Sequence, residues 1–148
     1  MLEIKINEIK IKYLRDVPKL IQKEGSDWID LYTPFDVILS KFKYTKIPLG
    51  IAMELPKGYE AIIAPRSSTF ERYGIIQTNG IGIIDEKYCG DNDEWHFPCI
   101  ELSNDIVCIP KHTRLCQFRL LKHQDLINFI EVEKLNNINR NGFGSTGI

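Results

Sequence analysis

Apolar and charged residues alternate along much of the chain. From Ile9 to Tyr13, apolar side chains hold every second position and lysines fill the positions between them. Successive side chains of a β-strand point to opposite faces, so this period of two predicts a strand with one buried face. Further strands are predicted at residues 4–6, 28–32, 36–39, 46–55, 59–64, 74–78, 97–102, 105–109, 114–122 and 127–135.

Turn-forming residues separate the predicted strands, and one short helix interrupts them. Pro, Gly, Asn and Asp stand between the strands, as in the Pro-Lys-Gly sequence at residues 56–58. Residues 69–73 can form a helix of about one to two turns. Ser67 or Ser68 would cap the start of this helix, and Gly74 would end it.

Many short strands with closely spaced turns favour an all-β fold, a sandwich or barrel of the jelly-roll kind. Residues 1–135 form this domain, because no linker interrupts the pattern. Residues 136–148 are polar and rich in Gly, and alone they cannot bury enough surface to offset the entropy lost on ordering. From the residues alone, a frayed tail is the preferred interpretation of this segment.

Composition narrows the functional class. The chain has 148 residues and a formal net charge of −1, which gives no reason to expect nucleic acid as the main partner. No apolar run approaches membrane-spanning length, and residues 1–6 lack the layout of a signal peptide, so we expect a cytoplasmic protein without a membrane partner. The four cysteines and three histidines lack zinc-site spacing, and the cysteines are expected to be reduced and mostly buried.

Two segments carry residues that suit phosphate. A predicted strand ends before Arg66, and the helix start that follows carries the hydroxyls of Ser67 and Ser68. The N–H groups of a helix start and the forked guanidinium of an arginine both favour an anion. An ordinary capped helix beside a surface arginine is an equal reading. Gln117 interrupts an apolar strand, and its amide needs a partner, which is either another strand or a phosphate.

Residues 79–91 have the pattern of a hairpin that presents a carboxylate. Apolar arms at residues 83–84 and 88–89 flank Asp85 and two further charged residues. A carboxylate at the end of an apolar arm can be partly desolvated and can act as a general base towards water. Tyr88 could pack its ring on a flat ligand. The structural alternative places Asp85 in a turn and Tyr88 in the core.

The tail contains a third group of residues that suits an anion. Its glycines let backbone N–H groups approach an anion closely, Ser145 and Thr146 add hydroxyl donors, and Arg140 adds positive charge. It is not a Walker A loop, because no lysine precedes the hydroxyl residues. Phe143 would be exposed unless it covers something.

In their order along the chain, these segments resemble the motifs of the trimeric dUTP pyrophosphatases, the dUTPases. The first to fifth motifs correspond to residues 27–31, 65–68, 79–91, 114–118 and 142–147. Five motifs in this order make the resemblance specific. The sequence of residues 91–95 is most similar to a bacterial and prophage subgroup known from Bacillus. The resemblance implies a jelly-roll homotrimer that hydrolyses dUTP to dUMP and pyrophosphate. This reaction would limit uracil incorporation into DNA and supply dUMP for dTTP synthesis.

The resemblance also implies roles for the residues of the third motif. Asp85 would be the catalytic base that orients and deprotonates the water attacking the α-phosphorus. Tyr88 would pack under the deoxyribose and leave no room for a 2′-hydroxyl. The backbone around Gly82 and Ile84, supported by Asn79, would read uracil.

The other motifs would hold the triphosphate. The phosphates would be bound by Arg66, Ser67, Ser68 and Gln117, of which the arginine and the glutamine count as catalytic. Asp30 would order a Mg²⁺ ion through water. The C-terminal arm of a neighbouring subunit would swap over the site as a lid: Phe143 would cover the base, while Arg140, Ser145 and Thr146 would clamp the outer phosphates.

Two alternatives and one auxiliary hypothesis accompany this interpretation. The dCTP deaminases share the fold and use a Glu on the strand after the hairpin, near Glu101, although a solvent-facing strand position is the preferred interpretation of that residue. A nucleotide-gated binding protein that docks a regulator is the other alternative. Trp95 is a candidate for covering or buttressing the lid.

Overall fold

The structure is a computed structural model that describes residues 5–144 and 147. Within these residues the elements are β1 (Lys10–Tyr13), β2 (Ile29–Tyr32), β3 (Val37–Leu39), β4 (Tyr44–Pro48), β5 (Ile51–Glu54), β6 (Tyr59–Pro65), α1 (Thr69–Tyr73), β7 (Ile75–Gln77), β8 (Gly82–Ile84), β9 (His96–Glu101), β10 (Val107–Ile109) and β11 (Arg114–Lys122). The prediction of an all-β domain with one short helix is confirmed. None of the described helical residues forms a helix long and apolar enough to cross a membrane.

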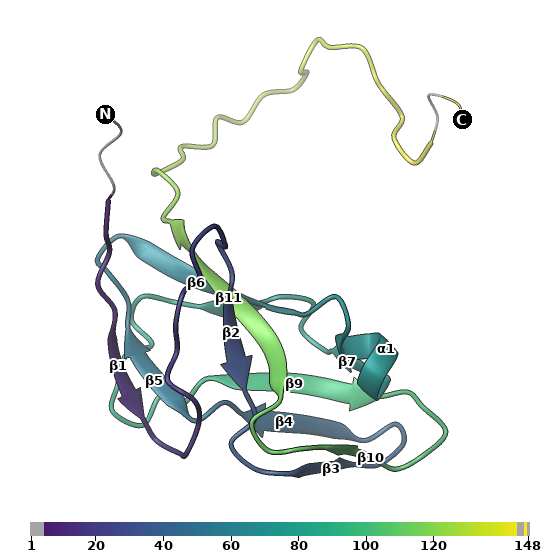
Figure 1. The fold of residues 1–148 in the computed structure, drawn as a ribbon. Coiled ribbons are helices and arrows are strands. Elements are labelled where there is room, and N and C mark those ends of the chain that lie inside the picture. The colour runs from purple at the N-terminus through teal and green to yellow at the C-terminus, as the bar shows by residue number, and fades with distance from the viewer. Residues whose placement is uncertain (1–4, 145–146, 148) are drawn as a thin grey trace.

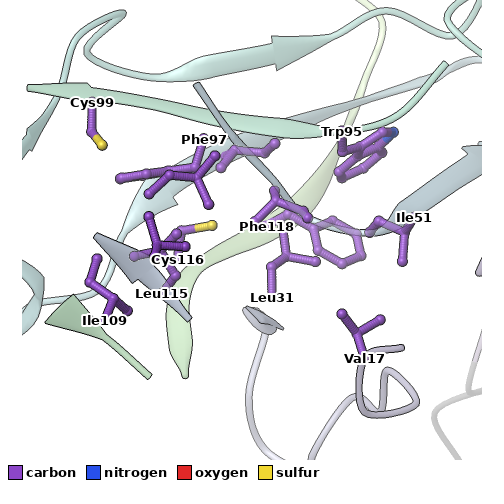
Figure 2. Packing of buried hydrophobic residues seen from close by; sticks show 14 of the residues in the cluster. Val17, Leu31, Ile51, Trp95, Phe97, Cys99, Ile109, Leu115, Cys116 and Phe118 are labelled. Carbon is purple, nitrogen blue, oxygen red and sulfur yellow. The ribbon is translucent and has the colours of Figure 1, made fainter. Parts of the chain in front are cut away.

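The strands form antiparallel sheets that enclose one apolar core. A four-stranded sheet has the order β2-β11-β6-β8, a three-stranded sheet has the order β4-β9-β7, and β1 pairs with β5 and β3 with β10. In Figure 1 the sheet around β11 lies above the sheet around β9. Phe118 of β11 meets Trp95, just before β9, edge to face with 5.2 Å between ring centroids, and Figure 2 shows this contact in the middle of the core.

The central position of β11 brings distant segments together. Along this strand Leu115, Cys116 and Phe118 are buried in the core. Gln117 lies opposite Asp30 of β2 on one side and Ala64 of β6 on the other. The strand therefore aligns three separate parts of the sequence at one end of the sheet.

Helix α1 is predicted correctly, but its start is built differently from the prediction. Gly74 ends the helix in the left-handed conformation, with a φ of 63°, and its N–H donates back into the helix. Ser68 takes the cap position without a side-chain cap hydrogen bond. The hydroxyl of Thr69 accepts the N–H of Arg66 and donates to the carbonyl of Leu115, both at 3.0 Å, which fixes the helix start to β11.

Three of the predicted strands and the predicted hairpin are wrong in detail. Residues 5 and 6 of the predicted strand 4–6 form no strand. The segment 46–55 divides at Gly50, whose φ of 75° suits a chain reversal, into the end of β4 and the start of β5. The arms at 83–84 and 88–89 do not pair with each other, because β8 pairs with β6. Residues 127–135 form no strand; they are exposed and extended, and Figure 1 shows the chain after β11 leaving the barrel.

The cysteines are all free, as predicted, but only two of them are buried. Cys99 and Cys116 lie in the core, whereas Cys89 and Cys108 are exposed. Burial raises the pKa of the Cys99 thiol to about 11, so this thiol stays protonated and unreactive.

Candidate functional site

A polar pocket opens where β2, β11 and the end of β6 meet. Its volume is about 430 Å³, and the side chains lining it include Asp30, Arg66, Ser67 and Gln117. The register of the sheet explains this grouping, because Gln117 stands between the strand of Asp30 and the strand that leads to Arg66. The structure thus brings together residues of the first, second and fourth motifs within one chain.

Positive charge dominates this pocket. Asp30 lies between two guanidinium groups, 3.5 Å from Nε of Arg66 and 3.7 Å from Nη1 of Arg114. Lys19 and Lys23, from the connection between β1 and β2, also line the pocket. Four cationic side chains against one carboxylate suit a polyanion such as a polyphosphate.

Sequence reasoning assigned no role to three of these cations. Arg114 begins the fourth motif, so its position next to Gln117 was a usable signal. Lys19 and Lys23 lie in a connection without periodic pattern. Their approach to the pocket follows from the path of the 14–28 connection and could not be read from the sequence.

Asp30 has the surroundings expected of an outer ligand to a phosphate-bound Mg²⁺. Among the described residues, no group of three or more His, Cys, Asp and Glu side chains could hold a metal ion by itself. Mg²⁺ commonly keeps several waters and takes its remaining ligands from one carboxylate and substrate phosphates. A single partly exposed carboxylate inside a cationic phosphate pocket therefore fits the ion when the phosphates accompany it.

The two serines of the second motif separate. Ser67 lines the large pocket, whereas Ser68 lines an adjacent small recess of about 50 Å³ together with Thr69 and Arg72. Arg66 and Arg114 border both spaces. Ser67 is therefore the serine that lies with Gln117.

The third motif forms a second group of candidate residues. Gly82 begins β8, and a Cβ added to it would lie 3.1 Å from Cβ of Ile63 and 3.6 Å from Nδ2 of Asn79, so a larger residue would crowd this strand pairing. Ile84 ends β8. The Tyr88 hydroxyl donates to the carbonyl of Glu94 at 2.9 Å.

Asp85 sits in the turn that follows β8. Its Oδ1 accepts the N–H of Lys87 at 2.7 Å, and its carbonyl accepts the N–H of Tyr88 at 3.0 Å. This arrangement matches the turn alternative for Asp85, although it leaves the second carboxylate oxygen available. The side chain is exposed, so the partial desolvation expected for a general base is not provided by its own chain.

The two groups of candidate residues cannot meet within one chain. Strand β8 pairs with β6 so that Gly82 lies opposite Ile63 and Ile84 lies opposite Ala61. Asp85, which follows Ile84, therefore lies towards the start of β6, whereas Arg66 follows the end of β6. Five to six residues of strand at about 3.3 Å each place the two side chains roughly 20 Å apart.

The tail residues lie away from both groups. The described part of the tail extends from the barrel in Figure 1. Phe143 is fully exposed, and the N–H of Gly142 donates to the carbonyl of Arg140 at 2.8 Å. Ser145 and Thr146 lie outside the described residues.

Two side chains outside the motifs are placed differently from the predictions. The hypothesis that Trp95 covers or buttresses the lid is wrong, because the side chain is 0% exposed and packs on Phe118 in the core. The solvent-facing interpretation of Glu101 is also wrong, since this residue is 0% exposed and one of its oxygens accepts the N–H of Ser103. Its burial removes it from any open substrate site, which disfavours a deaminase.

The sequence matches the model of one protein family over most of its length. The family is described as dUTPase, and the match covers residues 19–147, which include all five motifs. The chain belongs to the dUTPase family. The family resemblance found in the motifs is thereby confirmed.

Individual dUTPases show the same relation. The chain is 50% identical over 141 residues to the SPbeta prophage-derived deoxyuridine 5′-triphosphate nucleotidohydrolase YosS of Bacillus subtilis, covering 95% of this chain and 98% of that protein. Among solved structures, the dUTPase of Staphylococcus bacteriophage 80alpha with dUpNHpp has a TM-score of 0.77 at 16% identity and covers 97% of this chain and 100% of that one. A mutant dUTPase from phage phi11 of S. aureus, described with a coordinated structural Mg(II) ion, has a TM-score of 0.70 at 16% identity and covers 88% of this chain and 100% of that one. This shared architecture confirms the jelly-roll fold.

Proposed function

We propose that the protein is a dUTP diphosphatase, which hydrolyses dUTP to dUMP and pyrophosphate. Membership of the dUTPase family, together with motif residues gathered in one cationic pocket, carries this proposal. The reaction would keep uracil out of DNA and supply dUMP for dTTP synthesis. A cytoplasmic location fits four cysteines that are all reduced.

The pocket at the end of β6 would bind the triphosphate. Arg66 would contact phosphate oxygens through its guanidinium, Ser67 through its hydroxyl and Gln117 through its amide, which now donates to the Pro65 carbonyl at 3.2 Å. Ser68 would act from the adjacent recess. Phosphoryl transfer needs mainly positioning and charge neutralisation, which these donors supply.

A Mg²⁺ ion would accompany the substrate, held by the phosphates and, through water, by Asp30. When bound, the ion neutralises charge on the leaving pyrophosphate. The protein itself would hold the Asp30 carboxylate in position. The guanidinium groups of Arg66 and Arg114 lie 3.5 and 3.7 Å from its oxygens.

Asp85 would orient and deprotonate the attacking water. Its turn fixes one carboxylate oxygen on the N–H of Lys87 and leaves the other for water. The ring of Tyr88 would lie under the deoxyribose, and the backbone of Gly82 and Ile84, with Asn79 beside it, would bind uracil.

We further propose a homotrimer whose active sites are shared between chains. A separation of roughly 20 Å between Arg66 and Asp85 supports this, because the two sides of a site must then come from different copies. The same assembly would give the C-terminal arm a surface. Residues 136–148 would form a lid over a neighbour's site, with Phe143 on the base and Arg140, Ser145 and Thr146 near the outer phosphates.

A mixing experiment tests whether the sites are shared. Arg66→Ala and Asp85→Asn subunits should each be inactive, yet the whole population of trimers formed when both are co-expressed in equal amounts should regain about a quarter of parental activity. In random mixtures half of the chains supply Asp85 and half of their neighbours supply Arg66. Arg66→Ala mixed with Gln117→Ala is the matched control and should regain none, because both residues belong to the same chain's pocket. No recovery in the first mixture would show that each site lies within one chain.

A substrate panel tests the activity itself. Pyrophosphate release is expected from dUTP with Mg²⁺, with far slower release from dTTP, UTP and dCTP. Ammonia release from dCTP would instead support a deaminase. Binding of dUTP without release of pyrophosphate would support a nucleotide-gated binding protein.

A further inference from the structure

Tyr88 is held by a residue outside the five motifs. Its hydroxyl donates to the main-chain carbonyl of Glu94 at 2.9 Å, across a turn in which the N–H of Gly90 donates to Asp93 at 2.8 Å. Partial burial, with Asp93 and Glu94 nearby, raises the pKa of the Tyr88 phenol, so its hydroxyl keeps the proton that it donates. The orientation of the Tyr88 ring therefore depends on where the Glu94 peptide lies.

The side chain of Glu94 fixes that peptide to two other parts of the chain. Its carboxylate accepts two hydrogen bonds from the guanidinium of Arg15, at 2.7 and 3.0 Å, and one from the N–H of Gly50 at 2.9 Å. Only 11% of this side chain is exposed. Partial burial raises the pKa of the Glu94 carboxyl, the Arg15 guanidinium lowers it, and the net shift is downward, so the ion pair is charged at neutral pH.

The two partners of Glu94, Arg15 and Gly50, are also hydrogen-bonded to each other. The carbonyl of Gly50 accepts the N–H groups of Leu14 and Arg15, at 2.8 and 3.3 Å, which closes a ring between the end of β1 and the β4–β5 connection. A Cβ on Gly50 would lie 3.1 Å from Cβ of Arg15, so a larger residue at this position would crowd the Arg15 side chain. On the other side of Glu94, the N–H of Trp95 donates to Ile51 at 2.9 Å.

We infer that Arg15 and Glu94 are positioning residues that hold Tyr88 and thereby set the preference for a deoxyribose over a ribose nucleotide. A tyrosine ring can exclude a 2′-hydroxyl only if it cannot retreat, and the bidentate pair prevents retreat by fixing the carbonyl that Tyr88 binds. This inference rests on the proposed function, because it assigns a specificity role within the dUTP site.

The test compares selectivity among folded variants. Arg15→Ala and Tyr88→Phe should each lower the ratio of kcat/KM for dUTP over UTP by about fivefold, the effect of losing one hydrogen bond of ordinary strength. The double variant should fall no further than Tyr88→Phe alone, because both changes release the same ring. Lys10→Ala is the matched control: it removes another ion pair near the N-terminal strand, the 3.2 Å pair with Glu54 that links β1 to β5, and should leave the ratio unchanged because this pair does not reach Tyr88.

Hydrogen exchange separates this inference from the proposed function. In Arg15→Ala, backbone amides of residues 86–93 should exchange faster than in the parent, whether or not dUTP is turned over. If the parent hydrolyses dUTP but Arg15→Ala keeps both its selectivity and its exchange protection, the inference is overturned. If Arg15→Ala does not fold, Glu94→Gln replaces it, with the same expected ratio and the same overturning result. A parent that leaves dUTP intact would defeat the proposed function while the exchange result still reports on the contact.

Discussion

Asp85→Asn is expected to lower kcat for dUTP by about 10²–10⁴-fold, the usual contribution of a general base, with dUTP binding close to that of the parent. Asparagine is the informative change because its side-chain oxygen can still accept the N–H of Lys87, which Asp85 binds at 2.7 Å. The turn is thereby kept while the basic oxygen is lost. Single-turnover kinetics and the Kd for a non-hydrolysable dUTP analogue measure the two effects separately.

Asp85→Ala is the companion variant for this experiment. It removes both the base and the turn hydrogen bond, so any additional loss relative to Asp85→Asn reports on the geometry of the turn. Turnover by Asp85→Asn within about tenfold of the parent would rule out Asp85 as the base.

Trp95→Ala is expected to lower the free energy of unfolding by about 3–5 kcal/mol, as for other large aromatic residues truncated in a core. The side chain is fully buried and packs on Phe118 with 5.2 Å between ring centroids. Denaturant unfolding at one fixed protein concentration measures the loss, because the stability of an oligomer depends on concentration.

The exposed Ile106 provides the control for Trp95. It is 74% exposed, so Ile106→Ala should change the free energy of unfolding by less than about 0.5 kcal/mol. A Trp95→Ala variant that unfolds at nearly the parental denaturant concentration would contradict the core position of this side chain.

The sequence predicted those strands whose alternating pattern is matched by a partner in the same chain. Strands such as β1 and β11 follow their predicted segments closely, because one face of each packs on the core. Residues 127–135 have similar apolar content but form no strand, because within the described residues nothing from the same chain pairs with them. Alternation specifies a buried face and does not say which molecule buries it.

The sequence was enough to identify candidate site residues, but it did not predict how far apart they lie in the structure. The motif residues Asp30, Arg66 and Gln117 converge as the resemblance implied, because β11 aligns their strands. The distance between Arg66 and Asp85 depends on the register of β8 against β6, which no local pattern encodes. Trp95 follows a run of four polar residues, a context typical of a surface loop, and its burial is set by packing between the two sheets.

The extended segment after β11 has a consequence for how the protein is made. Several of its large apolar side chains are almost wholly exposed, and those of Leu126, Phe129 and Leu135 are each at least 79% exposed. A newly synthesised subunit therefore exposes an extended apolar segment. Chaperones bind segments of this kind, and such segments promote aggregation at high protein concentration. The yield of soluble protein during expression would then depend on the relative rates of subunit assembly and aggregation. Slower synthesis at lower temperature would favour assembly.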